Sequence, residues 1–219
     1  MIHTVIFDMD GVIIDTEPIH HAAFYKLFDE LAIQVSAAEY ASFLGSSTRN
    51  MMQQLKERYQ LPQDTEALVL RKRVLFNEIF DTDPSLDLLP GVRPLLDAIR
   101  QAGLGMVLAS SASKATIKRV FDRFGLAPYF AHVVSGEDFE RSKPDPAIFL
   151  HAAELAGTPV AECVVIEDSS NGMAAAKAAG IYCIGYASPH SEGQDLQLAD
   201  KVIHDFSELS AAKIAALPS

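Results

Sequence analysis

The segment HTVIFDMDG, residues 3–11, decides the fold. A short run of β-branched and aromatic residues, which favours a buried strand, ends there in two aspartates and a glycine. Similar apolar runs recur along the chain, between longer stretches that have the apolar spacing of amphipathic helices. This alternation predicts an α/β protein with a Rossmann-like, doubly wound parallel sheet. The expected strands cover residues 3–7, 105–109, 132–134, 163–166 and 182–185.

Capping residues mark the helices of this expected core. Ser113 can cap a helix that stops at Gly125, and two further helices are expected over about 145–157 and 171–180. The long stretch after the first strand breaks the rhythm, because it shows helical spacing and no convincing strand. We therefore expect a core of residues 1–15 and 86–219, with a small α-helical cap domain, residues 16–85, inserted after the first strand.

The composition is that of an acidic globular protein. The 219 residues are 49% hydrophobic and 21% charged, which is enough apolar material for a sizeable core. The formal net charge of −11 repels polyanions, so we expect no nucleic-acid partner and no membrane partner. An anionic small substrate remains compatible with this charge, because a metal ion and a few placed cations set the local field.

The two cysteines and the N-terminus indicate the compartment. Cys163 and Cys183 each lie within an apolar run, which is typical of small core thiols. The N-terminus lacks a basic segment before an apolar stretch, and no run approaches the ~18 apolar residues of a membrane helix. We expect a cytoplasmic protein that acts as a monomer.

Polar residues directly follow the expected strands. Each alone has an ordinary explanation as a helix cap, a turn residue or part of a solvated loop. In a doubly wound sheet, however, ligands bind at the carboxyl ends of the strands, so all of these residues should share one edge. They are Asp8 and Asp10 after the first strand, Ser110 and Ser111 after the second, Lys143 after the third, and Glu167 and Asp168 after the fourth.

Four carboxylates at one edge require a neighbouring cation. Two like charges ~4 Å apart cost about 4 kcal/mol at an effective dielectric constant near 20. Mg²⁺ prefers oxygen ligands, takes one or two protein carboxylates and completes its shell with water and substrate phosphate. The sequence therefore predicts a Mg²⁺ site that attracts phosphate, although the protein as a whole is acidic.

The residue types at this edge suit phosphoryl transfer. Asp8 is an ionised nucleophile that needs no base, and Asp10, two residues further along an extended strand end, can move the proton. Ser110 and Ser111 precede a helix N-terminus and can bind phosphate oxygens. Lys143 can neutralise charge on the phosphoryl group.

Four segments together resemble the motifs of the haloacid dehalogenase superfamily, in the same order, across essentially the whole chain. The resemblance is to the branch of β-phosphoglucomutase and small sugar-phosphate phosphatases, which carry a helical cap after the first motif. The second motif continues as Ser-Ser-Ala-Ser over residues 110–113, one residue longer than the Ser-Ala-Ser form of β-phosphoglucomutase, which favours the phosphatases. The segments are residues 7–12 (FDMDGV), 108–111 (LASS), 142–144 (SKP) and 165–169 (VIEDS).

This resemblance implies specific roles. Asp8 would be nucleophile and metal ligand, Asp10 would be general acid/base with its backbone carbonyl on Mg²⁺, and Asp168 would be a further ligand. Glu167 would support the metal through water. True dehalogenases lack the second aspartate and need no metal, so the presence of Asp10 argues against dehalogenation.

The cap is expected to select the substrate. By resemblance its candidate contacts are Glu17, His20, the segment 45–49 that contains Arg49, and Lys72, with Arg71 and Arg73 as competitors for the role of Lys72. His20 also has an ordinary explanation as a packing residue, and the cations as solvated surface charges.

The leading hypothesis is a Mg²⁺-dependent phosphatase that works through an aspartyl-phosphate, and the alternative is a β-phosphoglucomutase-type phosphomutase. Both would use the same core, so the sequence leaves them open. A receiver-like signalling module fits less well, because such modules phosphorylate an aspartate after a later strand and have no cap. A non-catalytic phosphate binder would not need Asp10.

Overall fold

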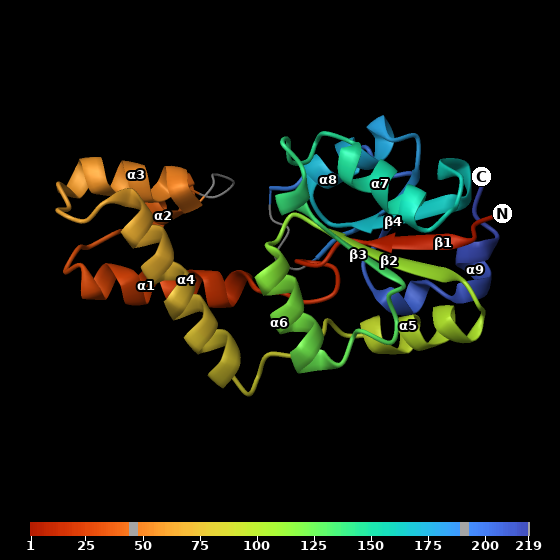
Figure 1. Cartoon of the computed structure of the whole chain (residues 1–219), viewed down its shortest axis with the longest axis horizontal. Helices are drawn as coiled ribbons and strands as arrows, with labels where there is room; N and C mark the ends of the chain where they lie inside the picture. Colours follow the sequence, from red (N-terminus) through yellow and green to blue (C-terminus); the bar gives the residue numbers. More distant parts are fainter. Residues whose placement is uncertain (44–47, 189–192, 219) are drawn as a thin grey trace. The chain divides into compact units, whose positions relative to one another are not determined.

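A six-stranded parallel sheet with strand order β3-β2-β1-β4-β5-β6 forms the centre of the larger of two compact units. In the computed structural model, which describes residues 1–43, 48–188 and 193–218, this unit contains Met1–Asp15 and Asp87–Ser219. The expected α/β fold with a parallel sheet is confirmed (Figure 1). The strands are β1 (Thr4–Phe7), β2 (Gly105–Ser110), β3 (His132–Ser135), β4 (Cys163–Glu167), β5 (Tyr182–Tyr186) and β6 (Lys201–Ile203).

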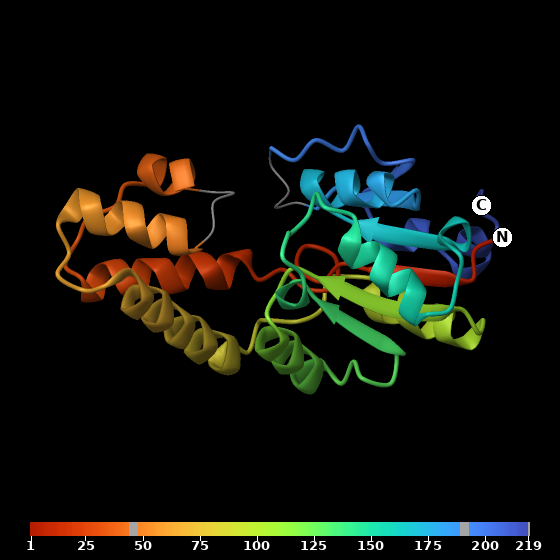
Figure 2. The ribbon, with the colours of Figure 1, turned by 45° about the horizontal axis from the view of Figure 1, so that its top comes forward.

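Helices cover both faces of this sheet, as Figures 1 and 2 show. Helices α7 and α8 bury one face, where Ile6, Val107 and Val165 meet Phe149 and Met173 in one apolar cluster. The other face is covered by α5, α6 and α9. The helices are α5 (Val92–Gln101), α6 (Lys114–Phe124), α7 (Ala147–Leu155), α8 (Ser170–Ala178) and α9 (Ala211–Ala215), with short 3-10 turns η1 (Gly136–Asp138), η2 (Val160–Glu162) and η3 (Phe206–Glu208).

The local signals in the sequence explain most of these boundaries. Ser113 caps α6 by accepting a hydrogen bond from the Thr116 amide, and Gly125 ends that helix in the left-handed region, as expected. The five expected strands each lie within one residue of the observed ones at either end. The sequence analysis missed β6, a three-residue edge strand with the exposed Val202, because it is too short to show an alternating pattern.

The smaller unit, Thr16–Leu86, is helical throughout its described part. Its two longest helices, α1 and α4, bury apolar residues such as Phe24, Leu27 and Leu75. Asp64 caps α4 by accepting a hydrogen bond from the Ala67 amide at 2.7 Å. The helices are α1 (Glu17–Glu30), α2 (Ala37–Phe43), α3 (Thr48–Tyr59) and α4 (Thr65–Thr82).

The chain leaves and re-enters the larger unit at one place. Ile14 forms an antiparallel bridge with Leu88, and the Leu89 amide donates to the carbonyl of Ile13 at 3.0 Å. The helical unit is thus a single insertion that follows β1. Within the described residues, no helix is both long enough and apolar enough to cross a bilayer.

Candidate active site

The strand register places the predicted site residues side by side. Phe7 of β1 lies opposite Leu108 of β2 and Ile166 of β4, so the residues that follow these positions reach the same edge of the sheet. Asp8 therefore lies next to Glu167, and its amide donates to the Ile166 carbonyl at 3.0 Å. We call this edge, at the ends of β1, β2 and β4, the carboxyl edge.

Lys143 joins three strands at the carboxyl edge. Its ammonium group donates to Asp8 Oδ1 at 2.5 Å, to Glu167 Oε1 at 2.8 Å and to the Ala109 carbonyl at 3.2 Å. An ammonium group has three donors, so these bonds use all of them. The Phe149 ring lies 4.7 Å from Nζ, and the side chain of Lys143 is 5% exposed.

Burial and charge alter the proton affinities of this cluster. Burial raises the pKa of Asp8 to about 7, with Glu167 and Asp10 adding to the rise and Lys143 opposing it. Burial acts to lower the pKa of Lys143, but Asp8 and Glu167 outweigh it and hold that pKa above its usual value. Lys143 therefore stays protonated beside Asp8, the carboxylate that the sequence analysis predicts to be the nucleophile.

Glu167 is the most enclosed carboxylate of the site, at 1% exposed. Its Oε2 accepts hydrogen bonds from the amide of Ser169 at 2.7 Å and from the hydroxyl of Ser169 at 2.9 Å, while Oε1 accepts from Lys143. The same Ser169 hydroxyl accepts from the Gly172 amide and caps α8. The sequence analysis allowed helix-cap chemistry for this segment, but it did not predict that Ser169 also holds Glu167.

Asp168 faces the turn that carries Asp10. A Cβ built on Gly11 would lie 2.0 Å from Asp168 Oδ2, and Gly11 has a φ of +79°. A side chain at position 11 would therefore collide with the carboxylate, so only glycine permits this approach. The approach brings a second strand-end carboxylate beside the Asp8-Met9-Asp10 turn.

These oxygen donors fit a hard divalent cation such as Mg²⁺. Asp8 and Asp168 supply carboxylates, and a cation next to Asp8 would favour its ionised form against the effect of burial. In the described ranges, no three His, Cys, Asp or Glu side chains converge as a ready-made metal cluster. A Mg²⁺ ion does not require one, because one or two carboxylates with carbonyl, water and phosphate oxygens complete its shell.

The two serines after β2 differ in exposure. Ser110 is buried at the strand end, and its Oγ accepts a hydrogen bond from the Ala112 amide at 3.1 Å. Ser111 is exposed, and its backbone packs so closely on Gly136 that a Cβ there would lie 3.0 Å from the Ser111 Cα. The peptide bond between Lys143 and Pro144 is cis, which the sequence did not indicate.

Two predicted substrate contacts of the helical unit meet inside that unit. Lys72 is 4% exposed, contacts Nδ1 of His20 and lies 4.6 Å from the centre of the Phe24 ring. Burial, with a smaller contribution from Lys72, lowers the pKa of His20 to about 3. Because an ammonium group only donates, Nδ1 must accept, and the neutral ring carries its proton on Nε2.

This burial predicts an acid-sensitive helical unit. As pH falls from about 6.5 towards 3, the unfolded chain binds a proton on His20 that the folded chain rejects, so stability falls by up to about 1.4 kcal/mol per pH unit. We expect His20→Asn, which keeps an acceptor for Lys72, to remove this contribution. Urea unfolding at several pH values, followed through amide exchange in α1 and α4, measures how the stability of the helical unit depends on pH.

His21→Asn is the matched control, because His21 is the exposed neighbour on the same helix. It should leave the pH dependence of stability close to that of the parent chain. If the free energy of unfolding depends on pH equally in the parent and in His20→Asn, His20 is not held neutral by burial.

The remaining predicted contacts of the helical unit lie near its surface. Glu17 is exposed at the start of α1. Arg49 is exposed and pairs with Glu66 at 2.9 Å, an ion pair that a substrate anion could displace at small cost. Arg71 pairs with Glu30, and Arg73 is exposed. Residues 45–47 of the predicted contact segment lie outside the described residues.

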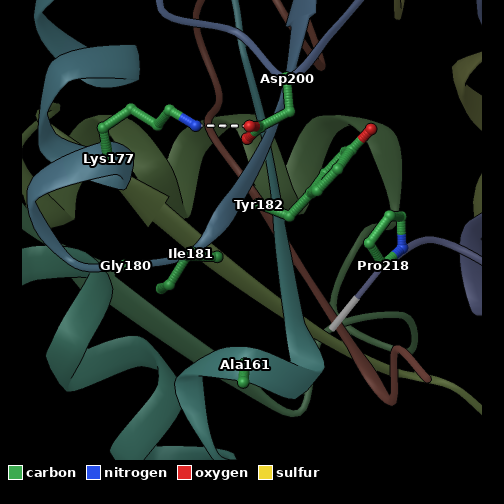
Figure 3. Close-up of a pocket in the computed structure, with 7 residues that line it drawn as sticks. All are labelled: Ala161, Lys177, Gly180, Ile181, Tyr182, Asp200 and Pro218. Carbon is green, nitrogen blue, oxygen red and sulfur yellow. Dashed lines mark hydrogen bonds and ion pairs between the residues drawn. The ribbon is translucent and has the colours of Figure 1, made fainter.

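A cavity of about 380 Å³ lies away from the carboxyl edge (Figure 3). It is lined by Tyr182, the first residue of β5, and by Pro218 and the ion pair of Lys177 with Asp200. Tyr182 lies level with Val164 in the sheet, three residues before Glu167. The cavity is thus at the amino ends of the strands and contains none of the clustered acids.

A family model described as haloacid dehalogenase-like hydrolase matches residues 2–180, which include every strand-end residue of the carboxyl edge. The chain belongs to the haloacid dehalogenase-like hydrolases. The family, the parallel α/β fold and the hydrolase class expected from the sequence are therefore confirmed.

Several members of the family are similar to this chain over nearly its full length. Hexitol phosphatase B of Escherichia coli is 32% identical over 94% of the chain and 93% of that protein. β-Phosphoglucomutase of Bacillus subtilis is 29% identical over 94% and 91%. The crystal structure of CbbY from Rhodobacter sphaeroides in complex with phosphate is 25% identical, covers 99% and 100%, and has a TM-score of 0.85.

One relative is much longer than this chain. Protein SUPPRESSOR OF QUENCHING 1, chloroplastic, of Arabidopsis thaliana is 31% identical over 87% of the chain, but the match spans only 18% of that protein. A segment similar to this chain therefore also occurs as one part of a larger protein.

Proposed function

We propose that the chain is a Mg²⁺-dependent phosphatase that hydrolyses a small phosphorylated metabolite, chiefly a sugar phosphate, through an aspartyl-phosphate intermediate. The observation that carries the proposal is the buried bridge from Lys143 to Asp8 and Glu167 at the carboxyl edge. A nucleophilic carboxylate, a fixed cation and further acidic residues meet there in one unit. Relatives named as a hexitol phosphatase and a phosphomutase support the substrate class.

The residues of the chain would divide the reaction into two steps. An oxygen of Asp8 attacks phosphorus while Asp10 gives a proton to the leaving alkoxide, which departs as an alcohol. Asp10 then takes a proton from the water that attacks the phosphorus of the aspartyl-phosphate. Inorganic phosphate leaves, and the Asp8 carboxylate is restored.

Three groups would stabilise the negative charge on the phosphoryl oxygens and on Asp8 during these steps. Lys143 stays protonated and offsets negative charge beside Asp8. Ser110 and Ser111 at the end of β2 would bind phosphoryl oxygens. A Mg²⁺ ion, held by Asp8, Asp168 and the backbone carbonyl of Asp10, would supply Lewis-acid stabilisation of the phosphoryl oxygens.

We propose that the inserted helical unit selects the substrate. Glu17 and Arg49 are its exposed candidates, whereas Lys72 and His20 interact within the unit. The neutral Nε2–H of His20 is a donor suited to a hydroxyl or phosphate oxygen.

A phosphomutase is the second candidate, because β-phosphoglucomutase of Bacillus subtilis is similar over 94% of the chain. It would use the same core but return the phosphoryl group to another hydroxyl of the sugar phosphate. The two activities differ only in what accepts the phosphoryl group from Asp8.

One experiment separates the two activities. The purified chain is offered phosphorylated sugars, hexitol phosphates and nucleotides, and both free phosphate and isomerised sugar phosphate are measured. Release of phosphate supports the phosphatase. Conversion of β-glucose 1-phosphate to glucose 6-phosphate without release would overturn it in favour of the mutase.

The same assay tests the metal. We expect a chelator to remove turnover and added Mg²⁺ to restore it, because the site would lose the cation that offsets its carboxylates. Full turnover in excess chelator would contradict the Mg²⁺ proposal.

A further inference from the structure

We infer that Gly172, in the first turn of α8, is a positioning residue for Lys143 and acts through Glu167. The missing side chain of Gly172 leaves the space in which the Glu167 carboxylate lies, and that carboxylate directs the ammonium group of Lys143 onto Asp8.

The contact between Gly172 and Glu167 leaves no room for a methyl group. A Cβ built on Gly172 would lie 1.7 Å from Glu167 Oε1, 1.9 Å from Cδ and 2.4 Å from Oε2. All three atoms belong to the carboxylate, so the whole group would have to move. Gly172 has ordinary helical backbone geometry and alanine is the better helix former, so the backbone gives no reason for a glycine here.

The displaced carboxylate could not move without releasing its partners. Glu167 is 1% exposed, and its two oxygens are held by Lys143 and by both donors of Ser169. Ser169 is also the N-cap of α8, so the helix start, the carboxylate and the glycine are one packed unit. A shift of Oε1 therefore removes one of the three acceptors that fix Lys143.

In the described part of the chain, three hydrogen bonds hold the ammonium group of Lys143 in place. Its three donors go to Asp8, Glu167 and Ala109, and its Nζ lies 4.7 Å from the centre of the Phe149 ring. Loss of the Glu167 acceptor would let the ammonium group turn away from Asp8. Small displacements of this kind reduce catalysis on the order of 10²-fold.

The test is a double-mutant cycle of Gly172→Ala and Glu167→Ala, with two readouts. The first is the ¹⁵N signal of the buried Lys143 ammonium group, identified by its loss in Lys143→Met and recorded without substrate. The second is kcat with the best substrate of the phosphatase screen. Only the kinetic readout rests on the proposed function, so a chain without phosphatase activity still reports on Lys143 through its ammonium signal.

We expect Gly172→Ala to shift the ammonium signal and to lower kcat on the order of 10²-fold with a smaller change in KM. In the Glu167→Ala background it should change neither, because no carboxylate remains to be displaced. Asn171→Ala, at the exposed neighbouring position of α8, is the matched control and should leave signal and rate unchanged.

Two results would overturn the inference. One is a Gly172→Ala variant with the parent's ammonium signal and rate, and the other is an equal loss in both backgrounds. If Gly172→Ala does not fold, folding of the double variant supports a collision with Glu167. Failure of the double variant to fold rejects it.

Discussion

Asp8→Asn should fold normally and lose turnover by about 10⁴-fold or more, because the amide oxygen cannot form the aspartyl-phosphate intermediate. The fold should survive because the amide has the shape of the carboxylate and still offers Oδ1 to Lys143. Substrate binding should persist for the same reason. Phosphate release measures turnover, calorimetry measures substrate binding, and urea unfolding measures the fold. A mass spectrum of acid-quenched enzyme detects the phosphoryl adduct.

The controls for this variant separate charge from chemistry. Asp29→Asn, an exposed change in α1, alters the net charge equally and should leave turnover intact. In the parent enzyme the phosphoryl adduct should map to the peptide that carries Asp8. Turnover of Asp8→Asn at the parent rate, or an adduct on another residue, would reject Asp8 as nucleophile.

Asp10→Asn should give a different result from Asp8→Asn. It removes the proton carrier but keeps the attacking group, so both steps slow by about 10²- to 10⁴-fold without being abolished. A substrate with a good leaving group, which needs no protonation, should recover the first step and leave the second slow. An unchanged rate for Asp10→Asn would assign the proton transfer to another residue.

The positions of the site residues could be predicted because a parallel sheet has few degrees of freedom. Once five apolar runs are recognised as parallel strands, the residues after them must reach one edge. Phe7 pairs with Ile166, so the residues that follow them, Asp8 and Glu167, lie side by side. The expected ends of the two strands, at residues 7 and 166, already imply this pairing. The ends of α6 could also be predicted, because Ser113 and Gly125 are residue types that cap helices locally.

The directions of the side chains could not be predicted in this way. Glu167 resembled a metal-supporting carboxylate, yet its oxygens are held by Ser169 and Lys143, and the space for it depends on Gly172. Contacts between α1 and α4, such as that of His20 with Lys72, depend on how two helices separated by more than 30 residues pack. No short-range pattern contains that information.

Lys143→Met should destabilise the core by about 3–5 kcal/mol, because it leaves buried carboxylates without their cation. Methionine matches the length of the lysine stem, so the change removes the ammonium group together with its contact to the Phe149 ring. Urea unfolding, followed through amide exchange in β1 and β4, measures stability in the core. Glu167→Gln should restore part of the loss in the Lys143→Met background, because it removes one of the unpaired charges.

Lys118→Met is the matched control for the loss of a lysine. Lys118 pairs with Asp122 on α6 at 2.6 Å, but both side chains are more than half exposed. Its loss should cost less than about 1 kcal/mol, since water replaces the partner of an exposed charge. The two lysines differ because Lys143 is buried, so water cannot replace its ammonium group beside Asp8 and Glu167. Mg²⁺, which binds only the folded site, should recover some of the stability of Lys143→Met. Equal losses for Lys143→Met and Lys118→Met would contradict a buried, charge-bearing bridge at Asp8 and Glu167.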